Sequence, residues 1–250
     1  MIPKYTLYSY DTLSSTNDMA HTLAQKGAPE WSVVVAKSQT AGRGRLNRKF
    51  HSPQGTGLYM SVIVRPQIAP CDALKITTAA AVSVATALEE LYGVTPTIKW
   101  VNDILVAGKK VCGILTESRL AGAALEYVVL GIGVNLTAPS GGFPEEIREI
   151  AGAVSDGTGD LGKMRVQLME GILEAFYPHY QNLHVEPCPF LEDYRSRLCC
   201  LNRPVHIIGE DGLSKRGTPI SLEPDFSLKV AMEDGTVQSL RAGEISLRLS

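Results

Sequence analysis

Two periods of hydrophobic and polar positions interleave over most of the chain. Apolar residues at helical spacing predict four helices, and runs of β-branched and aromatic residues predict the strands. The predicted helices cover 15–27, 71–93, 160–177 and 187–200, and the predicted strands cover 31–39, 57–66, 97–100, 104–106, 109–118 and 127–136. Because only short turns separate most of the strands after residue 96, we expect hairpins of one mixed sheet with flanking helices, an α+β fold.

The ends of the first two predicted helices carry residue types that favour helix termini. Ser15 or Thr16 can cap the first helix, and Gly27 would close it. Asp72 would cap the second helix, and Gly93 would end it. We therefore expect side-chain caps at both N-termini.

The last fifty residues change from helical spacing to period two. They contain four or five short alternating runs, with Asp-Gly turns at 211–212 and 234–235. This pattern predicts a small β-barrel, and the change of period places the boundary near 200–204. We expect one domain over 1–200 and a barrel over 201–250.

Composition excludes disorder and fibres, because 44% of the 250 residues are hydrophobic and 20% are charged. The net charge of -2 gives no overall attraction to nucleic acid or membranes. The five cysteines form no CxxC pair and no Cys/His cluster with zinc spacing, so we expect free thiols. The N-terminus lacks a signal-like pattern, and no apolar run approaches membrane-spanning length. We therefore expect a cytoplasmic protein.

A basic glycine-containing loop follows the strand at 31–39. Segment 37–53, KSQTAGRGRLNRKFHSP, has five Lys or Arg residues and no Asp or Glu. Its cations would repel one another unless they are solvated or face an anion. Arginine forks and exposed backbone N–H groups suit phosphate, so a phosphate-rich ligand would remove this conflict. A solvated surface loop is the alternative, because the segment fits neither GxxxxGK[ST] nor GxGxxG.

The hairpin at 99–115 is a second candidate site. Lys99, Asn102, Asp103 and Lys110 surround a tight turn between two apolar strands. Strand alternation places Lys110 on the face opposite Val111, so polar groups on that face could line a pocket. A solvated lysine on an edge strand is the alternative.

Two further segments have both a structural and a functional interpretation. Gly131 and Gly133 remove side chains from one face of a strand, which either leaves room for a flat ligand beside Asn135 or accommodates a bulge. The cluster SSTN, residues 14–17, offers hydroxyl and amide groups that helix capping alone would explain.

Taken in order, these segments resemble the biotin protein ligases. The order is SSTN at 14–17, QTAGRGR with RKFHSP at 39–53, KWVND with GKKVCGIL at 99–115, GIGVN at 131–135, and NRPV with GEISLR at 202–248. The resemblance extends from about residue 8 to 248. The glycine loop, KWVND and the GEISLR tail are specific in combination rather than singly.

The resemblance implies both a fold and a two-step reaction. The main domain would be similar to class II aminoacyl-tRNA synthetases, and the C-terminal unit would be an SH3-like barrel. Biotin carboxylate would attack the α-phosphate of ATP to give biotinyl-5'-AMP and pyrophosphate. A lysine of a biotin carboxyl carrier protein would then take the biotinyl group. Mg²⁺ would accompany ATP, with no metal held tightly by the protein.

The resemblance also implies residue roles. Lys110 would be the chief catalytic residue, bridging the biotin carboxylate and the α-phosphate, with Arg45, Asn102 and Asp103 beside it. The biotin site would comprise Ser15, Thr16, Asn17, Gln39, Gly42, Arg43, Gly44, Arg45, Lys110, Gly113, Gly131 and Gly133. The ATP site would comprise Arg45, Arg48, Lys49, Phe50, Asn102, Lys110, Asn135 and Arg248.

One residue departs from the family pattern, because Phe50 stands where Trp is usual. A smaller ring still stacks on adenine, so we expect ATP affinity to fall by about 0.5–1 kcal/mol while the chemistry survives. The loop over 42–51 is expected to be mobile without ligand and to order over biotin and phosphates, excluding water from the mixed anhydride.

Partners follow from the same resemblance. Regulatory members carry an N-terminal DNA-binding domain, whereas here the matching region starts within the first dozen residues, so we expect a monofunctional ligase that binds no DNA and no membrane. Homodimers form through sheet edges in this family, but no segment of this sequence requires one, so the oligomeric state stays open. Two alternatives remain: a lipoate or octanoate ligase or transferase of the same fold, which normally lacks GRGR, and a non-enzymatic module that binds nucleic acid or an acidic partner through the basic loop.

Overall fold

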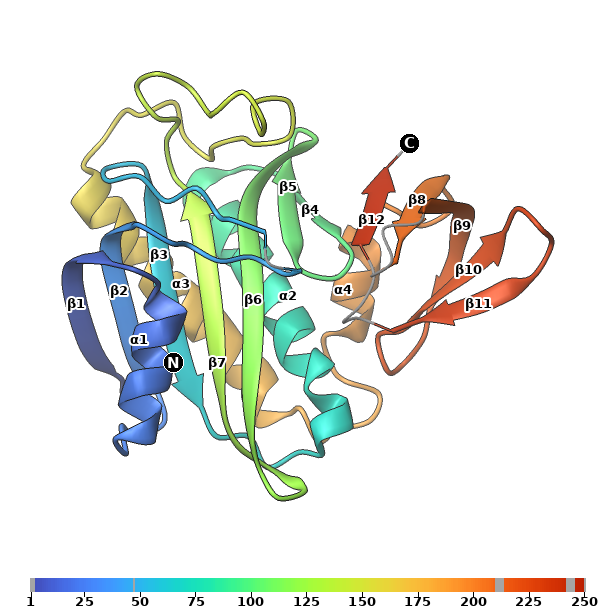
Figure 1. The fold of residues 1–250 in the computed structure, drawn as a ribbon, viewed down its shortest axis with the longest axis horizontal. Coiled ribbons are helices and arrows are strands. Elements are labelled where there is room, and N and C mark those ends of the chain that lie inside the picture. Colours follow the sequence, from blue (N-terminus) through green and yellow to red (C-terminus); the bar gives the residue numbers. More distant parts are fainter. Residues whose placement is uncertain (1–2, 47, 210–213, 242–245, 250) are drawn as a thin grey trace.

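A seven-stranded mixed sheet organises the larger part of the molecule (Figure 1). The computed structural model describes residues 3–46, 48–209, 214–241 and, as backbone alone, 246–249. In spatial order the strands are β1 (Thr6–Leu13), β2 (Ser32–Gln39), β3 (Gly57–Val64), β7 (Ala124–Asn135), β6 (Lys109–Ala121), β5 (Asp103–Val106) and β4 (Pro96–Lys99). Strands β1 and β2 run parallel, and the other neighbours run antiparallel. The predicted mixed sheet and α+β class are confirmed.

Two strands differ from the sequence prediction. The hydrophobic pattern assigned no element to β1, an edge strand whose side chains are mostly exposed and therefore give a weak periodic signal. The pattern of β3 indicated an alternating strand, but all eight of its residues are buried. It lies inside the sheet, between β2 and β7, with helices on both faces.

All four predicted helices are present, with shifted ends. They are α1 (Thr16–Gln25), α2 (Leu74–Tyr92), α3 (Leu161–Gln181) and α4 (Leu191–Arg197), and a short 3-10 turn, η1 (Pro70–Asp72), precedes α2. Figure 1 shows α1 in front of the sheet and α2 and α3 behind it. Helix α1 covers only part of the front face, and loops lie above the upper ends of β6 and β7 in Figure 1.

The predicted side-chain caps are wrong. Ser15 occupies the N-cap position of α1 but makes no capping bond, and Thr16 is the first helical residue. Gln39 Oε1 accepts from the Thr16 backbone N at 2.8 Å instead, so a side chain of β2 satisfies one free N–H of the helix. Asp72 lies in η1 and pairs with Lys75 Nζ at 3.1 Å. Gly93 ends α2 in the left-handed region, as predicted.

The C-terminal residues form a second, five-stranded sheet. Its spatial order is β11 (Val237–Leu240), β10 (Leu228–Met232), β9 (Ser214–Leu222), β8 (Val205–Ile208) and β12 (Ser246–Leu249), all antiparallel. The predicted Asp-Gly turn at 234–235 joins β10 to β11, with Gly235 at a φ of 84°. The turn predicted at 211–212 lies outside the described residues. The predicted short strands are confirmed.

The main hydrophobic core continues from the large sheet into the small one. Phe226, between β9 and β10, stacks on Phe190 with ring centroids 5.4 Å apart and meets Tyr194 edge-on. Trp100 Nε1 donates to the Phe226 carbonyl at 3.1 Å. A second, smaller core lies under α1, around Ala20 and Tyr127. The turn between β9 and β10 is therefore packed against α4 and the β4–β5 turn through buried aromatic rings.

One helical stretch in the described part of the chain, Pro70–Tyr92, is long and apolar enough by composition to cross a membrane. However, 72% of its most apolar window is buried inside the protein, as is usual for the central helix of a packed domain.

Candidate active site

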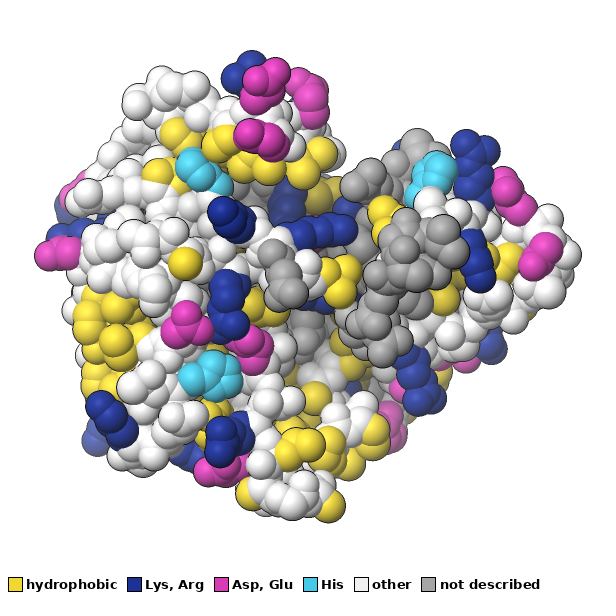
Figure 2. Space-filling model, in the orientation of Figure 1, with side chains coloured by type: hydrophobic (Ala, Val, Ile, Leu, Met, Phe, Trp, Pro, Cys, Tyr) yellow, Lys and Arg dark blue, Asp and Glu magenta, His cyan; other side chains and the backbone are white. Residues whose placement is uncertain are grey.

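A cavity of about 880 Å³ lies on the α1 face of the sheet, between the N-terminus of α1, the loop after β2 and the strands β5, β6 and β7. In Figure 2, Lys and Arg side chains gather around a hollow in the middle of this face. The cavity brings together most of the predicted site residues: Ser15, Thr16, Asn17, Gln39, Arg43, Gly44, Arg45, Arg48, Lys49, Phe50, Asn102, Asp103, Lys110, Gly113, Gly131, Gly133 and Asn135. Segments as far apart in the sequence as Ser15 and Asn135 thus meet in one place.

Two predicted residues are placed differently. Gly42 is buried at the base of the basic loop, and its carbonyl accepts from the Phe50 backbone N at 2.9 Å. A Cβ there would lie 2.5 Å from the Phe50 carbonyl oxygen, so this glycine shapes the loop. The backbone of Arg248 lies in β12 opposite His206, and its side chain is outside the described residues.

The glycines of β6 and β7 form the floor of the cavity. Gly113 and Gly133 face each other across the two strands, and the Phe50 ring lies over them. A Cβ at Gly133 would be 2.5 Å from Phe50 Cε1, and one at Gly131 would be 2.2 Å from Asn17 Oδ1. The predicted room beside Asn135 is therefore filled largely by the chain's own side chains. Pairing through Gly131 and Gly133 is regular, so the bulge alternative is wrong.

A buried polar network lies at the N-terminus of α1. Gln39 Oε1 accepts from the Thr16 hydroxyl at 3.2 Å as well as from its backbone N. Ser61 Oγ lies 2.8 Å from Thr16 Oγ1 and 2.6 Å from Asn17 Oδ1, and Gln39 Nε2 donates to Ser52 Oγ at 2.9 Å. The network gives each amide a fixed orientation, which a selective polar pocket requires. The sequence patterns gave no sign of Ser52 or Ser61.

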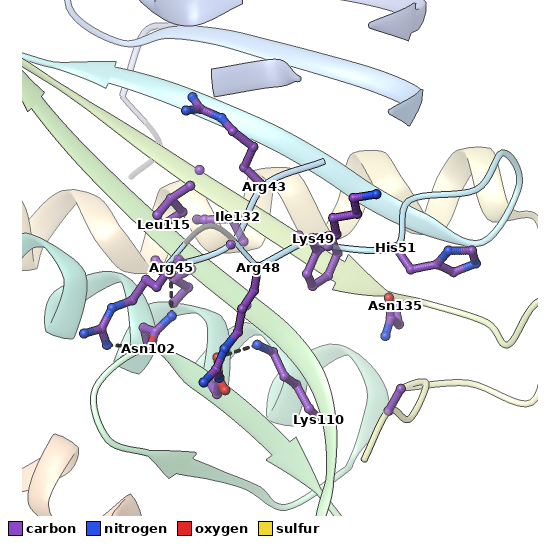
Figure 3. A pocket seen from close by; sticks show the side chains of 18 of the residues that line it. Arg43, Arg45, Arg48, Lys49, His51, Asn102, Lys110, Leu115, Ile132 and Asn135 are labelled. Atoms are coloured by element: carbon purple, nitrogen blue, oxygen red, sulfur yellow. Dashed lines mark hydrogen bonds and ion pairs between the residues drawn. The ribbon is translucent and has the colours of Figure 1, made fainter. Parts of the chain in front are cut away.

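Cations converge at the other end of the cavity (Figure 3). Lys110 Nζ lies 2.5 Å from Asp103 Oδ1, and Arg45 Nη1 donates to Asn102 Oδ1 at 3.1 Å. Asn102 Nδ2 in turn donates to the Ile114 carbonyl at 2.7 Å, which fixes the amide.

Burial makes this cationic end unfavourable for charge. It lowers the pKa of Lys99, against the attraction of Asp103, and the nearby cations Lys110 and Arg48 lower it further. Burial likewise lowers the pKa of Arg45. A bound polyanion would offset both the free-energy cost of burying these charges and the repulsion between them.

A β-bulge aims Lys110 into the cavity. Leu105 pairs with Lys110 and Ile104 pairs with Cys112, so Val111 is the extra residue. Strict alternation would put Lys110 and Gly113, three positions apart, on opposite faces; instead a Cβ at Gly113 would lie 3.2 Å from Lys110 Nζ. Val111 and Cys112 both join the main core. The edge-lysine alternative is wrong, because β6 lies between β5 and β7.

The loop over 136–160 forms a wall that the sequence patterns missed. Lys110 N donates to the Ile150 carbonyl at 2.7 Å, and Gly152 N donates to the Lys110 carbonyl at 2.8 Å. Asn135 Nδ2 donates to the Gly152 carbonyl at 3.0 Å, so this predicted ligand also holds the loop. Phe143, Glu146 and Ile147 line the cavity from this wall. The segment has no hydrophobic periodicity that would have indicated them.

Among the residues that the structure describes, no group of three or more His, Cys, Asp or Glu is placed to hold a metal ion. Asp103 and Asn102 nevertheless offer, beside the cations, the carboxylate and amide oxygens that Mg²⁺ prefers.

Comparison with known proteins decides the family. A model of the biotin/lipoate A/B protein ligase family matches residues 9–135, half of the chain. The chain belongs to the biotin/lipoate A/B protein ligase family. The matched region includes every predicted site residue except Arg248.

Curated relatives of this family member are biotin ligases. It is 42% identical over 176 residues to the bifunctional ligase/repressor BirA of Bacillus subtilis, covering 70% of this chain and 54% of that protein. It is 31% identical over 201 residues to the biotin--[acetyl-CoA-carboxylase] ligase of Mycobacterium tuberculosis, covering 77% of this chain and 71% of that protein. The chain thus spans about half the length of the BirA relative.

A solved structure extends the match across both sheets. The biotin protein ligase of Aquifex aeolicus, in complex with biotin and ATP, has a TM-score of 0.77 and 27% identity, covering 98% of this chain and 99% of that chain. The large mixed sheet and small antiparallel sheet of this family member are therefore an arrangement found in a biotin protein ligase.

Proposed function

We propose that this chain is a biotin protein ligase that forms biotinyl-5'-AMP from biotin and ATP and transfers biotin to a lysine of a biotin carboxyl carrier protein. The observation that carries the proposal is a single cavity with two chemically different ends. A neutral polar network around Thr16, Asn17 and Gln39 lies at one end, and cations around Lys110 lie at the other.

The neutral end suits the ureido ring of biotin. That ring presents two N–H donors and a carbonyl acceptor, so its recognition requires oriented partners, and a ligand without these groups would leave buried polar atoms unpaired. We assign the ring to Ser15, Thr16, Asn17 and Gln39. Gly131 leaves space for the Asn17 amide that would contact this ring, whereas Gly113 and Gly133 leave space for the Phe50 ring beside it.

The cationic end suits the reacting anions. A biotin carboxylate oxygen attacks the α-phosphorus, the bond from that phosphorus to the bridging oxygen breaks, and pyrophosphate leaves. Two anions must approach, so fixed positive charge in a partly desolvated site lowers the barrier. We assign Lys110 to the carboxylate and α-phosphate together and Arg45 to the same oxygens, with Asn102 and Asp103 orienting those two side chains.

The second step forms an amide. The acceptor lysine amine attacks the carbonyl carbon of the mixed anhydride, AMP leaves with the bonding electrons, and the amine proton passes to solvent. The basic loop, including Arg43 and Gly44, would exclude water until the acceptor arrives. We assign adenine to Phe50 and Asn135, and the phosphates to Arg48, Lys49 and Arg248. Mg²⁺ would enter with the ATP phosphates.

The remaining expectations complete the proposal. Residues 1–200 form the catalytic unit, similar to class II aminoacyl-tRNA synthetases, and 201–250 form an SH3-like barrel. We expect cytoplasmic action without a DNA or membrane partner, and a homodimer is one possible oligomeric state, which light scattering with and without biotin and ATP would identify.

Substrate choice is the direct test. Purified protein is incubated with ATP, Mg²⁺ and, in parallel, biotin, lipoate or octanoate, and the acyl-adenylate is measured by mass spectrometry. We expect an adenylate from biotin alone, followed by biotinylation of an added carrier domain. An adenylate from lipoate or octanoate but not from biotin would refute the proposal in favour of the lipoate branch of the family.

A further inference from the structure

Glu117, on β6, connects the neutral end of the cavity to the basic loop. Its Oε2 atom accepts from Asn17 Nδ2 at 2.7 Å and from Arg43 Nη2 at 2.9 Å. The imidazole of His21 approaches the same oxygen at 3.7 Å. One carboxylate oxygen thus serves a residue of the cavity and a residue of the loop above it.

The carboxylate determines which way the Asn17 amide points. Asn17 Oδ1 lies 2.6 Å from the Ser61 hydroxyl, and Nδ2 faces Glu117 and, at 3.4 Å, the Leu115 carbonyl. A hydroxyl can donate or accept, so Ser61 alone would tolerate a flipped amide. A carboxylate only accepts, so Glu117 selects the orientation with Nδ2 toward β6.

The same carboxylate holds the loop. Arg43 also pairs with Asp18 Oδ1 at 2.7 Å, but the side chain of Asp18 is 49% exposed and that of Glu117 is 28% exposed. The less exposed partner is less screened by water, so Glu117 provides the stronger attachment. Backbone pairing of Arg43 with Lys49 carries this attachment to the rest of the loop.

We propose that Glu117 is a positioning residue that couples recognition of the ureido ring to closure of the basic loop. This proposal rests on the proposed function. The Asn17 amide, which would bind the ureido ring, and Arg43, which would help to close the loop, both bind the Glu117 carboxylate. Ring recognition and loop closure then stabilise each other, and a carboxylic acid without a polar ring gains less from closure.

Glu117→Gln tests the coupling with little change of shape. A glutamine can both donate and accept, so only the longer contact with the Leu115 carbonyl still favours the Asn17 orientation, and the Arg43 contact loses its charge. We expect the Kd for biotin to rise about tenfold by titration calorimetry. Hydrogen exchange of 42–46 and 48–50 should become faster, both in the empty protein and with biotinyl-AMP bound. The turnover rate at saturating biotin and ATP should stay within about twofold of wild type, so the variant should change KM for biotin but not kcat.

Two further variants serve as controls. Glu126→Gln removes a carboxylate of β7 that pairs with Arg119 outside the cavity and should leave both Kd and exchange unchanged. Asp18→Asn should change both loop exchange and the Kd for biotin less than Glu117→Gln does, because the Asp18 carboxylate pairs with Arg43 and does not orient the Asn17 amide.

An unchanged Kd or unchanged loop exchange in Glu117→Gln would overturn the coupling. Failure of the proposed function is distinguishable: if the wild-type protein binds lipoate but not biotin, the assignment of the substrate is wrong, and loop exchange in the empty protein still decides whether Glu117 anchors Arg43.

Discussion

Two glycines of one strand adjoin different side chains on the cavity floor. Gly131 lies against the Asn17 amide and Gly133 lies against the Phe50 ring, although the two are only two residues apart on β7. Each is therefore next to a side chain assigned to a different substrate. A methyl group at either position must displace its neighbour, because the contacts would be far below van der Waals distance.

Alanine at these two positions should separate biotin binding from ATP binding. Gly131→Ala should raise the Kd for biotin by about tenfold or more, because it disturbs a buried hydrogen-bonded amide, and should affect the Kd for ATP less. Gly133→Ala should displace Phe50 and therefore raise the Kd for ATP more than the Kd for biotin. Calorimetric titration of each variant with each ligand measures this. Equal losses for both ligands in both variants would contradict this separation.

Glu117 should also contribute to stability with a defined pH dependence. The contact with His21 lowers its pKa most, Asn17 and Arg43 lower it further, and partial burial opposes them. A carboxyl with a lowered folded-state pKa stabilises the fold fully above its ordinary value of 4.5 and loses that contribution as the pH falls through the lowered value. The difference in unfolding free energy between wild type and Glu117→Gln should therefore shrink below pH 4.5. A constant difference from pH 7 to pH 3 would contradict this.

At the scale of elements, a bulge and a loop fix the position of Lys110. The bulge aims its side chain into the cavity, and the loop over 136–160 holds its backbone through Ile150 and Gly152. Close approach of the two segments depends on Gly152, where a Cβ would lie 2.6 Å from Lys109 Cβ. The loop therefore contributes to the placement of Lys110 through two backbone hydrogen bonds.

Gly152→Ala should move the loop away from β6 and disturb Lys110. We expect the rate of biotinyl-AMP formation to fall about tenfold, since small misplacements of a reacting group are costly. Gly141→Ala is the matched control, because it lies in the same loop with open space around its Cβ position and should be close to wild type. Single-turnover kinetics compare the two. Equal rates would mean that the loop does not position Lys110.

The elements that the sequence predicted correctly share a strong periodic signal. The buried strands and α2 carry apolar residues over many positions, so their existence could be read directly. Strand β1 was missed because its exposed side chains carry little such signal. The bulge at Val111 and the cap from Gln39 depend on contacts between distant segments, which periodicity cannot report. The motifs predicted most of the residues that meet in the cavity, but Glu117 and the loop wall lie outside those motifs.

At the scale of the molecule, an aromatic cluster connects the small sheet to α4 and to the β4–β5 turn of the large sheet. Phe226, in the turn between β9 and β10, is fully buried against Phe190 and Tyr194, and its carbonyl accepts from Trp100, just ahead of Asn102. The change from helical to strand periodicity marked where the small sheet begins. The contacts of Phe226 at this junction join segments far apart in the sequence, so the hydrophobic pattern could not predict them.

Loss of the Phe226 ring should destabilise both sheets together. We expect Phe226→Ala to lower the free energy of unfolding by about 3–5 kcal/mol, as for other large core truncations. Urea unfolding followed by circular dichroism and by tryptophan fluorescence should show one coincident transition. Phe226→Leu should retain a larger part of the stability. Two separate transitions in the alanine variant would instead indicate that the sheets unfold independently.

The central claim is that Lys110 and its neighbouring cations neutralise two approaching anions during adenylate formation. Biotin-dependent exchange of pyrophosphate into ATP measures this step most directly, with Lys110→Gln compared against Lys37→Gln, an exposed lysine paired with Asp11 away from the cavity. We predict a loss of at least about 100-fold for Lys110→Gln in a folded protein and near wild-type exchange for Lys37→Gln. Exchange by Lys110→Gln at more than half of the wild-type rate would contradict the account.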